Sequence, residues 1–255
     1  MKYAQLIIGL LAGTAIGGTV VASTGTPAGA TADAETIKKI VREVISEEPK
    51  LIMESVQKFQ MSQQKKQAEG ASEAMKDSAV QEKVYNDPNA ASHGPKDSKR
   101  VMAEFFDYNC GACKYMFKSI DELIKKDKTV RVVFHEYPIF GPVSEMNSKI
   151  GLAVNRLYAE KYYDFHVKMM THEGRVDDKV AYGYAKDLGM DVEKLQAEVA
   201  KPELNAILEN NRQLGDTLQI QGTPTLTIGT EVVQHALSFT DLESKLNGNS
   251  APKKD

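Results

Sequence analysis

The chain has 255 residues, of which 42% are hydrophobic and 26% are charged. These values are close to the average for soluble globular proteins and exclude fibrous and wholly disordered classes. The formal net charge of -3 gives no basic excess that would indicate a nucleic-acid partner. Two cysteines are too few for a disulfide-stapled scaffold or for a structural zinc site built on four thiolates.

The first thirty residues follow the order of a secretory signal peptide, with Lys2 before an apolar run and small residues after it. Cleavage is expected after Ala22 or Ala30. An uncleaved membrane anchor is the alternative, because the run from Tyr3 to Ala22 is just long enough to cross a bilayer. We favour cleavage, which predicts a periplasmic or other extracytoplasmic location where disulfides persist. Association with the outer membrane is left open.

Residues 33–85 are predicted to form a helical segment, because apolar residues recur at the spacing of one helix face. That face comprises Ile37, Ile40, Val41, Val44 and Ile45. Pro49 suits the first turn of a second helix, and the polar stretch from Met61 to Lys83 indicates a solvated helix or a flexible arm. Two short amphipathic helices cannot bury both faces, so we expect the segment to form homo-oligomers. Packing on the chain's own domain is the alternative.

Residues 86–99 are rich in turn-forming residues and are predicted to be a linker. The region 100–247 then begins with a strand over 101–106, a helix over 111–126 and a second strand over 129–134. This βαβ order implies two parallel strands with a helical crossover.

A helical insertion is predicted over about 144–218, with breaks at Gly174, Gly189 and Pro202. Its aromatic and methionine side chains are expected to form core rather than a peptide-binding groove. They are Tyr158, Tyr162, Tyr163, Phe165, Met169 and Met170.

Strand patterns return at 225–228 and 231–234, and the Gly229-Thr230 turn between them suits a type II′ hairpin. A final helix is expected from Thr240, with Glu243 completing a capping box, and the tail 248–255 is predicted to be disordered. The fold class is therefore α/β, a small mixed sheet with a helical insertion.

The sequence Cys110-Gly111-Ala112-Cys113 lies where a predicted strand meets a predicted helix. At such a helix N-terminus, unpaired backbone N–H groups and the helix dipole stabilise a thiolate. Cys113 falls on the apolar face of the helix, so we expect Cys110 to be the nucleophile and Cys113 the resolving thiol.

Metal binding and an inert structural disulfide are the alternatives for this pair. There is no second CxxC, and the histidines at 135, 166 and 172 show no obvious pairing with the cysteines. A four-residue loop also constrains the unfolded chain little. Redox chemistry is therefore favoured, and the sequence predicts neither a cofactor nor a bound metal.

A second motif, Gly222-Thr223-Pro224-Thr225, precedes a predicted strand. Together with the segment from Glu104 to Cys113 and that from Val132 to Pro138, it resembles the DsbA-like branch of the thioredoxin superfamily. The helical N-terminal segment makes the ScsC-like and Com1-like group the nearest. The resemblance implies a thioredoxin fold with the helical insertion.

The resemblance also implies roles for single residues. Pro224 would be a cis-proline facing the active disulfide, where an ordinary trans turn is the alternative. Thr223 would offer its backbone to an extended substrate segment. Glu104 would relay a proton to or from Cys113, unless it is an ordinary acid at a strand edge.

The dipeptide Gly111-Ala112 departs from the Pro-His of DsbA itself and supplies no side-chain donor to a thiolate. We therefore expect Cys110 to be less acidic and the protein to be a milder oxidant.

The resulting hypothesis is an exported thiol:disulfide oxidoreductase that acts on exported proteins and is reset by a membrane or periplasmic redox partner. Isomerase or reductase work is slightly favoured over oxidation. The alternative from another class is a binding protein, which would capture a soft metal such as Cu(I) through the thiols or act as a chaperone or surface module.

Overall fold

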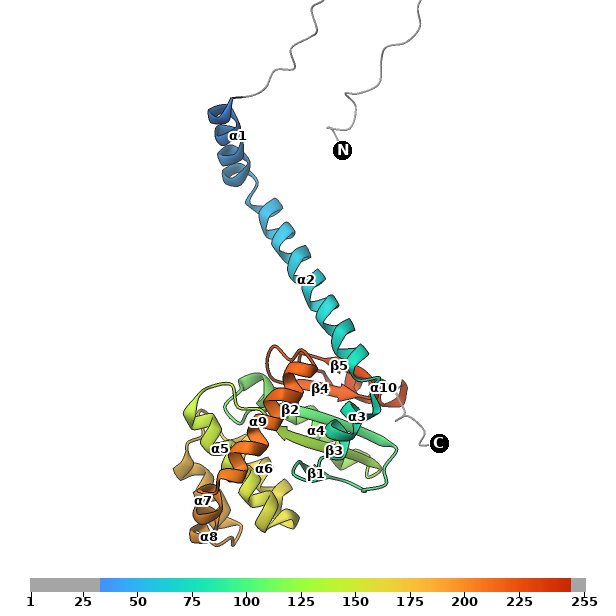
Figure 1. Cartoon of the computed structure of the whole chain (residues 1–255), viewed down its shortest axis with the longest axis vertical. Helices are drawn as coiled ribbons and strands as arrows, with labels where there is room; N and C mark the ends of the chain where they lie inside the picture. The colour runs from blue at the N-terminus through green and yellow to red at the C-terminus, as the bar shows by residue number, and fades with distance from the viewer. Residues whose placement is uncertain (1–32, 249–255) are drawn as a thin grey trace, which may run out of the picture. The chain divides into compact units, whose positions relative to one another are not determined.

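The computed structural model describes residues 33–248 (Figure 1). The expected signal peptide and all of the expected tail except Gly248 lie outside the described residues. The chain divides into two compact units, which meet between Val56 and Gln57. Within residues 33–248, no helix is long and apolar enough to cross a membrane.

The described part of the first unit consists of α1 (Ala34–Glu47) and the start of α2 (Pro49–Ala74). The Asp33 carboxylate caps α1 by accepting a hydrogen bond from the backbone N–H of Thr36 at 2.8 Å. Pro49 opens α2, as its fixed φ favours. No residue of α1 is buried, so the predicted apolar face is present and lies open to solvent.

The second unit is built on one mixed five-stranded sheet with the order β1-β3-β2-β4-β5. The central strands β2 and β3 are parallel and are joined by the crossover helix α4, as the sequence predicts, while the other three pairings are antiparallel. The elements are β1 (Ala91–His93), β2 (Arg100–Phe106), α4 (Gly111–Lys126), β3 (Val130–Glu136), β4 (Thr225–Ile228) and β5 (Glu231–Val233).

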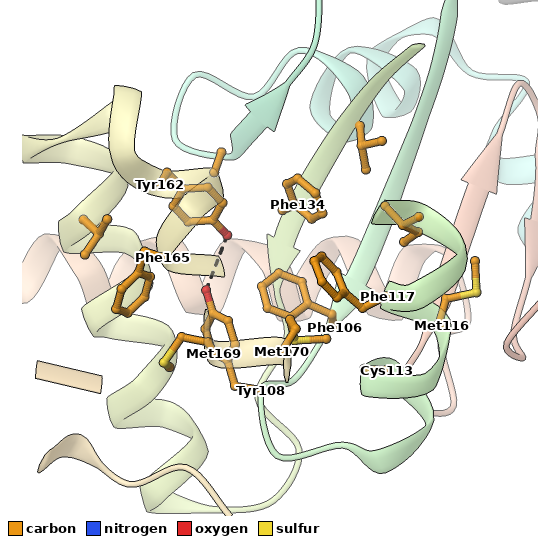
Figure 2. Close-up of a cluster of buried hydrophobic side chains, with 14 of the residues drawn as sticks. Phe106, Tyr108, Cys113, Met116, Phe117, Phe134, Tyr162, Phe165, Met169 and Met170 are labelled. Carbon is orange, nitrogen blue, oxygen red and sulfur yellow. Dashed lines mark hydrogen bonds between the residues drawn. The ribbon is translucent and has the colours of Figure 1, made fainter. Parts of the chain in front are cut away.

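Strand β2 supplies both faces of the sheet with core residues, because successive side chains point to opposite sides. Met102 and Phe106 join the larger core with the buried side of α4 (Figure 2). Ala103 and Phe105 join a smaller core on the other face. The sheet is therefore covered on both sides, as a parallel pair requires.

The smaller core also takes up the C-terminal part of the predicted helical segment. Ala71 and Met75, at the end of α2 and just after it, are buried there with residues of α3 (Ser78–Tyr85). The Tyr85 hydroxyl donates a hydrogen bond to the carbonyl of Gly229 at 2.8 Å. The sequence predicts that this polar stretch is solvated or flexible. Its C-terminal part instead packs on the sheet, because its few apolar residues are buried there.

A short strand lies inside the segment expected to be a linker. Residues Ala91–His93 pair antiparallel with β3, and the ring of His93 stacks on that of Tyr163 at 4.0 Å. A three-residue strand between turns carries no periodicity that a sequence pattern can detect. Gly94 follows it with φ +107°, and a β-carbon there would collide with the carbonyl of Val130.

The helical insertion is present, and the predicted breaks are confirmed. Gly174 and Gly189 have positive φ in the connections before α7 and α8, and Pro202 opens α9. An additional break near Tyr158 separates the first two helices. The helical elements of this region are α5 (Pro142–Leu157), η1 (Ala159–Lys161), α6 (Tyr162–Thr171), α7 (Asp178–Asp187), α8 (Val192–Val199) and α9 (Pro202–Thr217).

The C-terminal hairpin fits the predicted turn, because Gly229 has φ +60° while Thr230 is not in the positive-φ region. The last helix, α10 (Phe239–Gly248), begins one residue earlier than expected. Its cap is Ser238, whose hydroxyl accepts from the backbone N–H of Asp241 and donates to that residue's carboxylate. The expected cap of Thr240 with Glu243 is therefore wrong, since Ser238 offers the same pattern two residues earlier.

Candidate active site

The two cysteines lie at the start of α4, directly after the turn that follows β2. Cys110 is the N-cap residue with extended backbone (φ -81°, ψ 115°), and Cys113 is in the first helical turn. Both are thiols in the structure and both are largely buried, with Cys110 5% exposed and Cys113 fully buried. The helix N-terminus thus lies beside Cys110, as the sequence predicts.

The environments of the two thiols shift their pKa values in opposite directions. The pKa of Cys110 is lowered to about 5, chiefly by the hydrogen bond with the Cys113 thiol. The Thr223 side chain and the N–H groups of Ala112 and Cys113 lower it further, while burial opposes the change. The pKa of Cys113 is raised by burial, by the neighbouring Cys110 and by the charge of Glu104. At neutral pH the nucleophilic form is therefore confined to Cys110.

The Thr223–Pro224 peptide bond lies against Cys110 and is cis, as expected. The Cys110 thiol donates a hydrogen bond to the Thr223 carbonyl at 3.2 Å. The Thr223 hydroxyl is buried and has no other hydrogen-bond partner, so it is available to donate to a thiolate at Cys110. The structure thus brings together two motifs that are more than a hundred residues apart in the sequence.

Glu104 is fully buried on β2, on the same face as Met102 and Phe106. Neither carboxyl oxygen has a hydrogen-bond partner. Burial raises the pKa of Glu104 to about 8, and the charge of Cys110 adds to the shift. Near neutral pH this carboxyl group is mostly protonated and lies within electrostatic range of both cysteines. Glu104 therefore carries a proton at a pH where Cys110 is a thiolate.

Comparison with known proteins agrees with this geometry. Residues 86–247, more than half of the chain, match a family model described as thioredoxin. The chain belongs to the thioredoxin family. This confirms the predicted fold, in which the thioredoxin sheet carries the helical insertion.

A curated relative of this thioredoxin-family chain is disulfide bond formation protein D of Bacillus subtilis, 24% identical over 168 residues that span 60% of this chain and 73% of the relative. The structure of the thiol-disulfide exchange protein alpha-DsbA2 from Wolbachia pipientis is 27% identical with a TM-score of 0.65, covering 71% of this chain and 96% of that one. The predicted membership of the DsbA-like thiol:disulfide oxidoreductases is confirmed at this level.

A fold likeness to the ScsC-like group extends over most of the chain. The structure of Proteus mirabilis ScsC in a transitional conformation has a TM-score of 0.63 at 24% identity. It covers 84% of this chain and 95% of the ScsC chain. At that identity the likeness concerns the fold.

Sequence reasoning missed a buried carboxylate that organises the catalytic turn of this thioredoxin-family protein. Asp107 accepts hydrogen bonds from the N–H of Asn109 at 2.7 Å and from the Ser144 hydroxyl at 2.8 Å. It also accepts from the N–H groups of Ile139 at 2.8 Å and Phe140 at 3.3 Å. One side chain thus joins the turn before Cys110 to the connection between β3 and α5. An aspartate two residues before an asparagine at a strand end is the turn signal that would have found it.

Asn109 performs a similar task toward the connection between α6 and α7. Its side chain accepts from the N–H of Val176 at 2.8 Å and donates to the carbonyl of the same residue at 3.1 Å. Lys114 donates to the carbonyls of His172 and Gly174 at 2.8 and 2.6 Å. The helical insertion is therefore fastened to the catalytic turn at two places.

The expected insertion core is confirmed, and Figure 2 shows how it reaches the catalytic turn. Tyr162, Phe165, Met169 and Met170 are buried, and Tyr158 and Tyr163 pack at the edge. The Tyr108 hydroxyl, two residues before Cys110, donates to Glu136 at 2.9 Å and lies 3.5 Å from the Tyr162 hydroxyl.

The described histidines do not converge on the cysteines to form a metal site. His135 contacts the carbonyl of Val84 at 2.8 Å, and His172 contacts the Tyr184 hydroxyl at 2.8 Å. His166 lies among aromatic rings, where burial lowers its pKa to about 3. Within residues 33–248 there is no group of three metal-ligating side chains.

Proposed function

We propose that this protein exchanges disulfides with other exported proteins, with Cys110 as the attacking atom and Cys113 as the resolving thiol. The observation that carries the proposal is the environment of Cys110, whose pKa falls to about 5 at the N-terminus of α4 beside the Thr223–Pro224 bond. A thiolate in that position is the reactive species in thiol–disulfide exchange.

The oxidising reaction proceeds in two balanced steps. A substrate thiolate attacks the Cys110 sulfur of the Cys110–Cys113 disulfide, a new sulfur–sulfur bond forms, and Cys113 leaves as a thiolate that takes a proton. A second substrate thiolate then attacks the substrate sulfur, and Cys110 leaves with the electron pair. The substrate loses two electrons and the enzyme gains them. Reduction begins from the Cys110 thiolate and runs the same steps in reverse. Isomerisation shares that first attack, but a different substrate thiolate then attacks the substrate sulfur of the mixed disulfide, so Cys110 leaves as a thiolate and no net electrons are transferred.

Glu104 is the proposed source or acceptor of the Cys113 proton. It is a buried carboxyl group with a pKa of about 8 and no hydrogen-bond partner. A group whose pKa lies near the working pH transfers protons efficiently in both directions. No cofactor takes part in the exchange, because the two sulfur atoms carry both electrons.

The direction we favour is isomerase or reductase work. Gly111 and Ala112 supply only backbone to the Cys110 sulfur, and a thiol pKa of about 5 lies between the values of about 3.5 and 7 for a strong oxidant and a reductant. Trapping the cysteines in cells by rapid alkylation tests the direction. A pair found mainly as thiols supports isomerase or reductase work, and a pair found mainly as disulfide supports oxidation.

We also propose that the N-terminal helices assemble several copies of the chain. Five apolar side chains of α1 are between 41% and 52% exposed, and a single short helix has no means of covering them. The experiment is light scattering on the full chain and on a variant with Ile40→Asp and Val44→Asp. Both substitutions lie on the exposed face, so loss of the oligomer without loss of the fold supports the proposal. A monomeric parent protein contradicts it.

A truncation that tests assembly should remove residues only as far as residue 56, and not the whole helical segment as far as residue 86. Ala71, Met75 and Tyr85 are buried in the second unit, and removing them would open its smaller core. Deletion of residues 31–56 removes α1 and the start of α2 and leaves that core intact.

The sequence of residues 1–30 supports export, and the proposed partner that resets the cysteines is a periplasmic or membrane redox protein. The function is tested by insulin reduction and by reactivation of scrambled ribonuclease. Wild type should act in both assays, Cys110→Ser should be inactive, and Cys113→Ser should accumulate a mixed disulfide with the substrate. Equal and negligible activity in wild type and Cys110→Ser would instead favour a binding protein.

A further inference from the structure

The connection between α9 and β4 brings Thr223 and Pro224 to the nucleophilic cysteine (Figure 1). It comprises residues 218–224, and none of them belongs to a helix or a strand. Its placement bears on the reaction, because the Thr223 carbonyl accepts the Cys110 thiol at 3.2 Å. The contacts that hold this connection therefore also set where Thr223 lies relative to the sulfur atom.

The first part of the connection is fixed by the end of α9 and by the smaller core. Gln219 has φ +51°, in the left-handed region where a helix commonly ends. The N–H of Ile220 bonds to the carbonyl of Gly215 at 2.9 Å, which closes the last turn. Ile220 is buried in the smaller core with Ala71 and Met75. The chain is thus held by helix closure and apolar packing as far as Ile220.

The side chain of Gln234 holds the next part. Gln234 follows β5 directly, and the register that pairs Val233 with Leu226 brings it alongside the start of β4. Its Oε1 accepts the N–H of Gln221 at 2.9 Å, and its Nε2 donates to the carbonyl of Gln219 at 3.0 Å. One side-chain amide therefore pairs with two backbone groups, much as the backbone of a neighbouring strand would.

The Gln234 contacts end just before a glycine. Gly222 separates Gln221 from Thr223, and a β-carbon at Gly222 would meet nothing within 4 Å. The Thr225 hydroxyl donates to the Gly222 carbonyl at 2.8 Å, but glycine itself restricts the backbone less than any other residue. Without the Gln234 amide, the backbone that leads into Thr223 would have more freedom to move.

We propose that Gln234 is a positioning residue of the exchange reaction, whose amide holds the backbone of Thr223 where an extended substrate chain bonded to Cys110 can pair with it. This inference rests on the proposed function and deepens it, because it names a residue outside both motifs on which the substrate-binding backbone depends. A backbone edge that is ordered in advance binds a peptide without the entropy cost of ordering it. Gln234 acts through the backbone of Gln219 and Gln221.

The experiment uses the reduced full-length protein and two disulfide substrates with the same leaving group. One is a short peptide of alanine and serine with a central cysteine, and the other is N-acetylcysteine amide. Each cysteine carries a thionitrobenzoate group in disulfide linkage. The Cys110 thiolate attacks the cysteine sulfur, a new sulfur–sulfur bond forms, and thionitrobenzoate leaves with the electron pair as a coloured thiolate. Stopped-flow absorbance gives the rate constant for each substrate.

The ratio of the two rate constants is the decisive quantity, because only the peptide has flanking backbone that can pair with Thr223. Wild type should favour the peptide about tenfold. Gln234→Met keeps the length of the side chain and loses both hydrogen bonds, so the ratio should fall to about two. Gln234→Ala should show the same fall. Gln213→Met is the matched control and should keep the wild-type ratio, since Gln213 is an exposed amide that bonds within α9 to Glu209 at 3.2 Å.

The outcomes separate this inference from the function on which it rests. A wild type that releases thionitrobenzoate from neither substrate contradicts the proposed function. A wild type that reacts equally with both substrates contradicts the inference alone, and so does a Gln234→Met protein that keeps the wild-type ratio. If both rate constants of the Gln234 variants fall by the same factor, the residue supports the thiol or the fold in general, which also overturns the inference.

Discussion

Two neighbouring strands each bury a glutamate, and the surroundings of the two carboxyl groups differ. Glu104 on β2 has no hydrogen-bond partner and lies within electrostatic range of both cysteines. Glu136 at the end of β3 accepts a hydrogen bond from Tyr108 and lies beneath the helical insertion. Burial raises the pKa of both. The unpartnered group is the one proposed to transfer a proton, and the bonded one links the turn before Cys110 to β3.

Replacing Glu104 with glutamine should have the largest effect of three tests of this comparison. The folded protein keeps its proton up to a pKa of about 8, while the unfolded chain releases it near 4.5. This group's contribution to stability is therefore full below about pH 4.5 and is lost as the pH rises through 8. Glutamine has no proton to lose, so Glu104→Gln should be more stable than reduced wild type at pH 8.5 by about 5 kcal/mol.

Urea denaturation at pH 4 and pH 8.5 measures this difference, with the exposed Glu173→Gln as control. The two proteins should be equally stable at pH 4. The same variant should slow exchange about tenfold or more, because resolution by Cys113 loses its proton partner. Identical stability curves for wild type and Glu104→Gln at both pH values would place the carboxyl group in water rather than in the core.

Replacing Gly151 with alanine tests how closely the Glu136 group is packed. A β-carbon there would collide with a carboxyl oxygen of Glu136 and lie 2.8 Å from the Tyr108 hydroxyl. Crowding this bonded pair should lower the free energy of unfolding by about 1–3 kcal/mol. Gly183→Ala is the matched control in α7, where a β-carbon meets nothing within 4 Å and should stabilise the helix by about 0.5–1 kcal/mol. Equal effects of the two substitutions would refute close packing around Glu136.

Tyr108→Phe should have the smallest effect, because it removes one hydroxyl and leaves the ring in the core. Glu136 loses its donor, and we expect a loss of about 1–2 kcal/mol in thermal or urea unfolding. Removal of this donor should also raise the pKa of Glu136 further. The exposed Tyr115→Phe serves as control and should be neutral. If the Tyr108→Phe protein is as stable as its parent, the hydrogen bond between Tyr108 and Glu136 contributes nothing measurable to the free energy of unfolding.

The parts of the fold that the sequence predicted are those with strong periodicity or distinctive residues. Local rules predict the strand–helix junction at Cys110, the breaks at Gly174 and Gly189, and the helices that begin with proline. The three-residue strand Ala91–His93 could not be predicted, because its stability comes from pairing with β3. The docking of Met75 likewise depends on a core assembled from distant segments.

The candidate site divides in the same way. Cys110, Cys113 and Pro224 stand out by motif, and their proximity follows from the family resemblance. Asp107 and Asn109 carry only a local turn signal, since their importance arises from partners up to 67 residues away. Glu104 lacks a hydrogen-bond partner because of how the interior packs. The neighbouring residues in the sequence give no sign of this.

The two borders of the sheet carry a consequence for a protein proposed to exchange disulfides with other proteins. Strands β1 and β5 occupy these borders, and each is three residues long. A long unpaired border would recruit a passing chain by backbone pairing and could seed co-aggregation. Because both borders are short, a substrate released after disulfide exchange finds few unpaired backbone groups with which to form hydrogen bonds. Its dissociation is therefore favoured over strand pairing with the sheet.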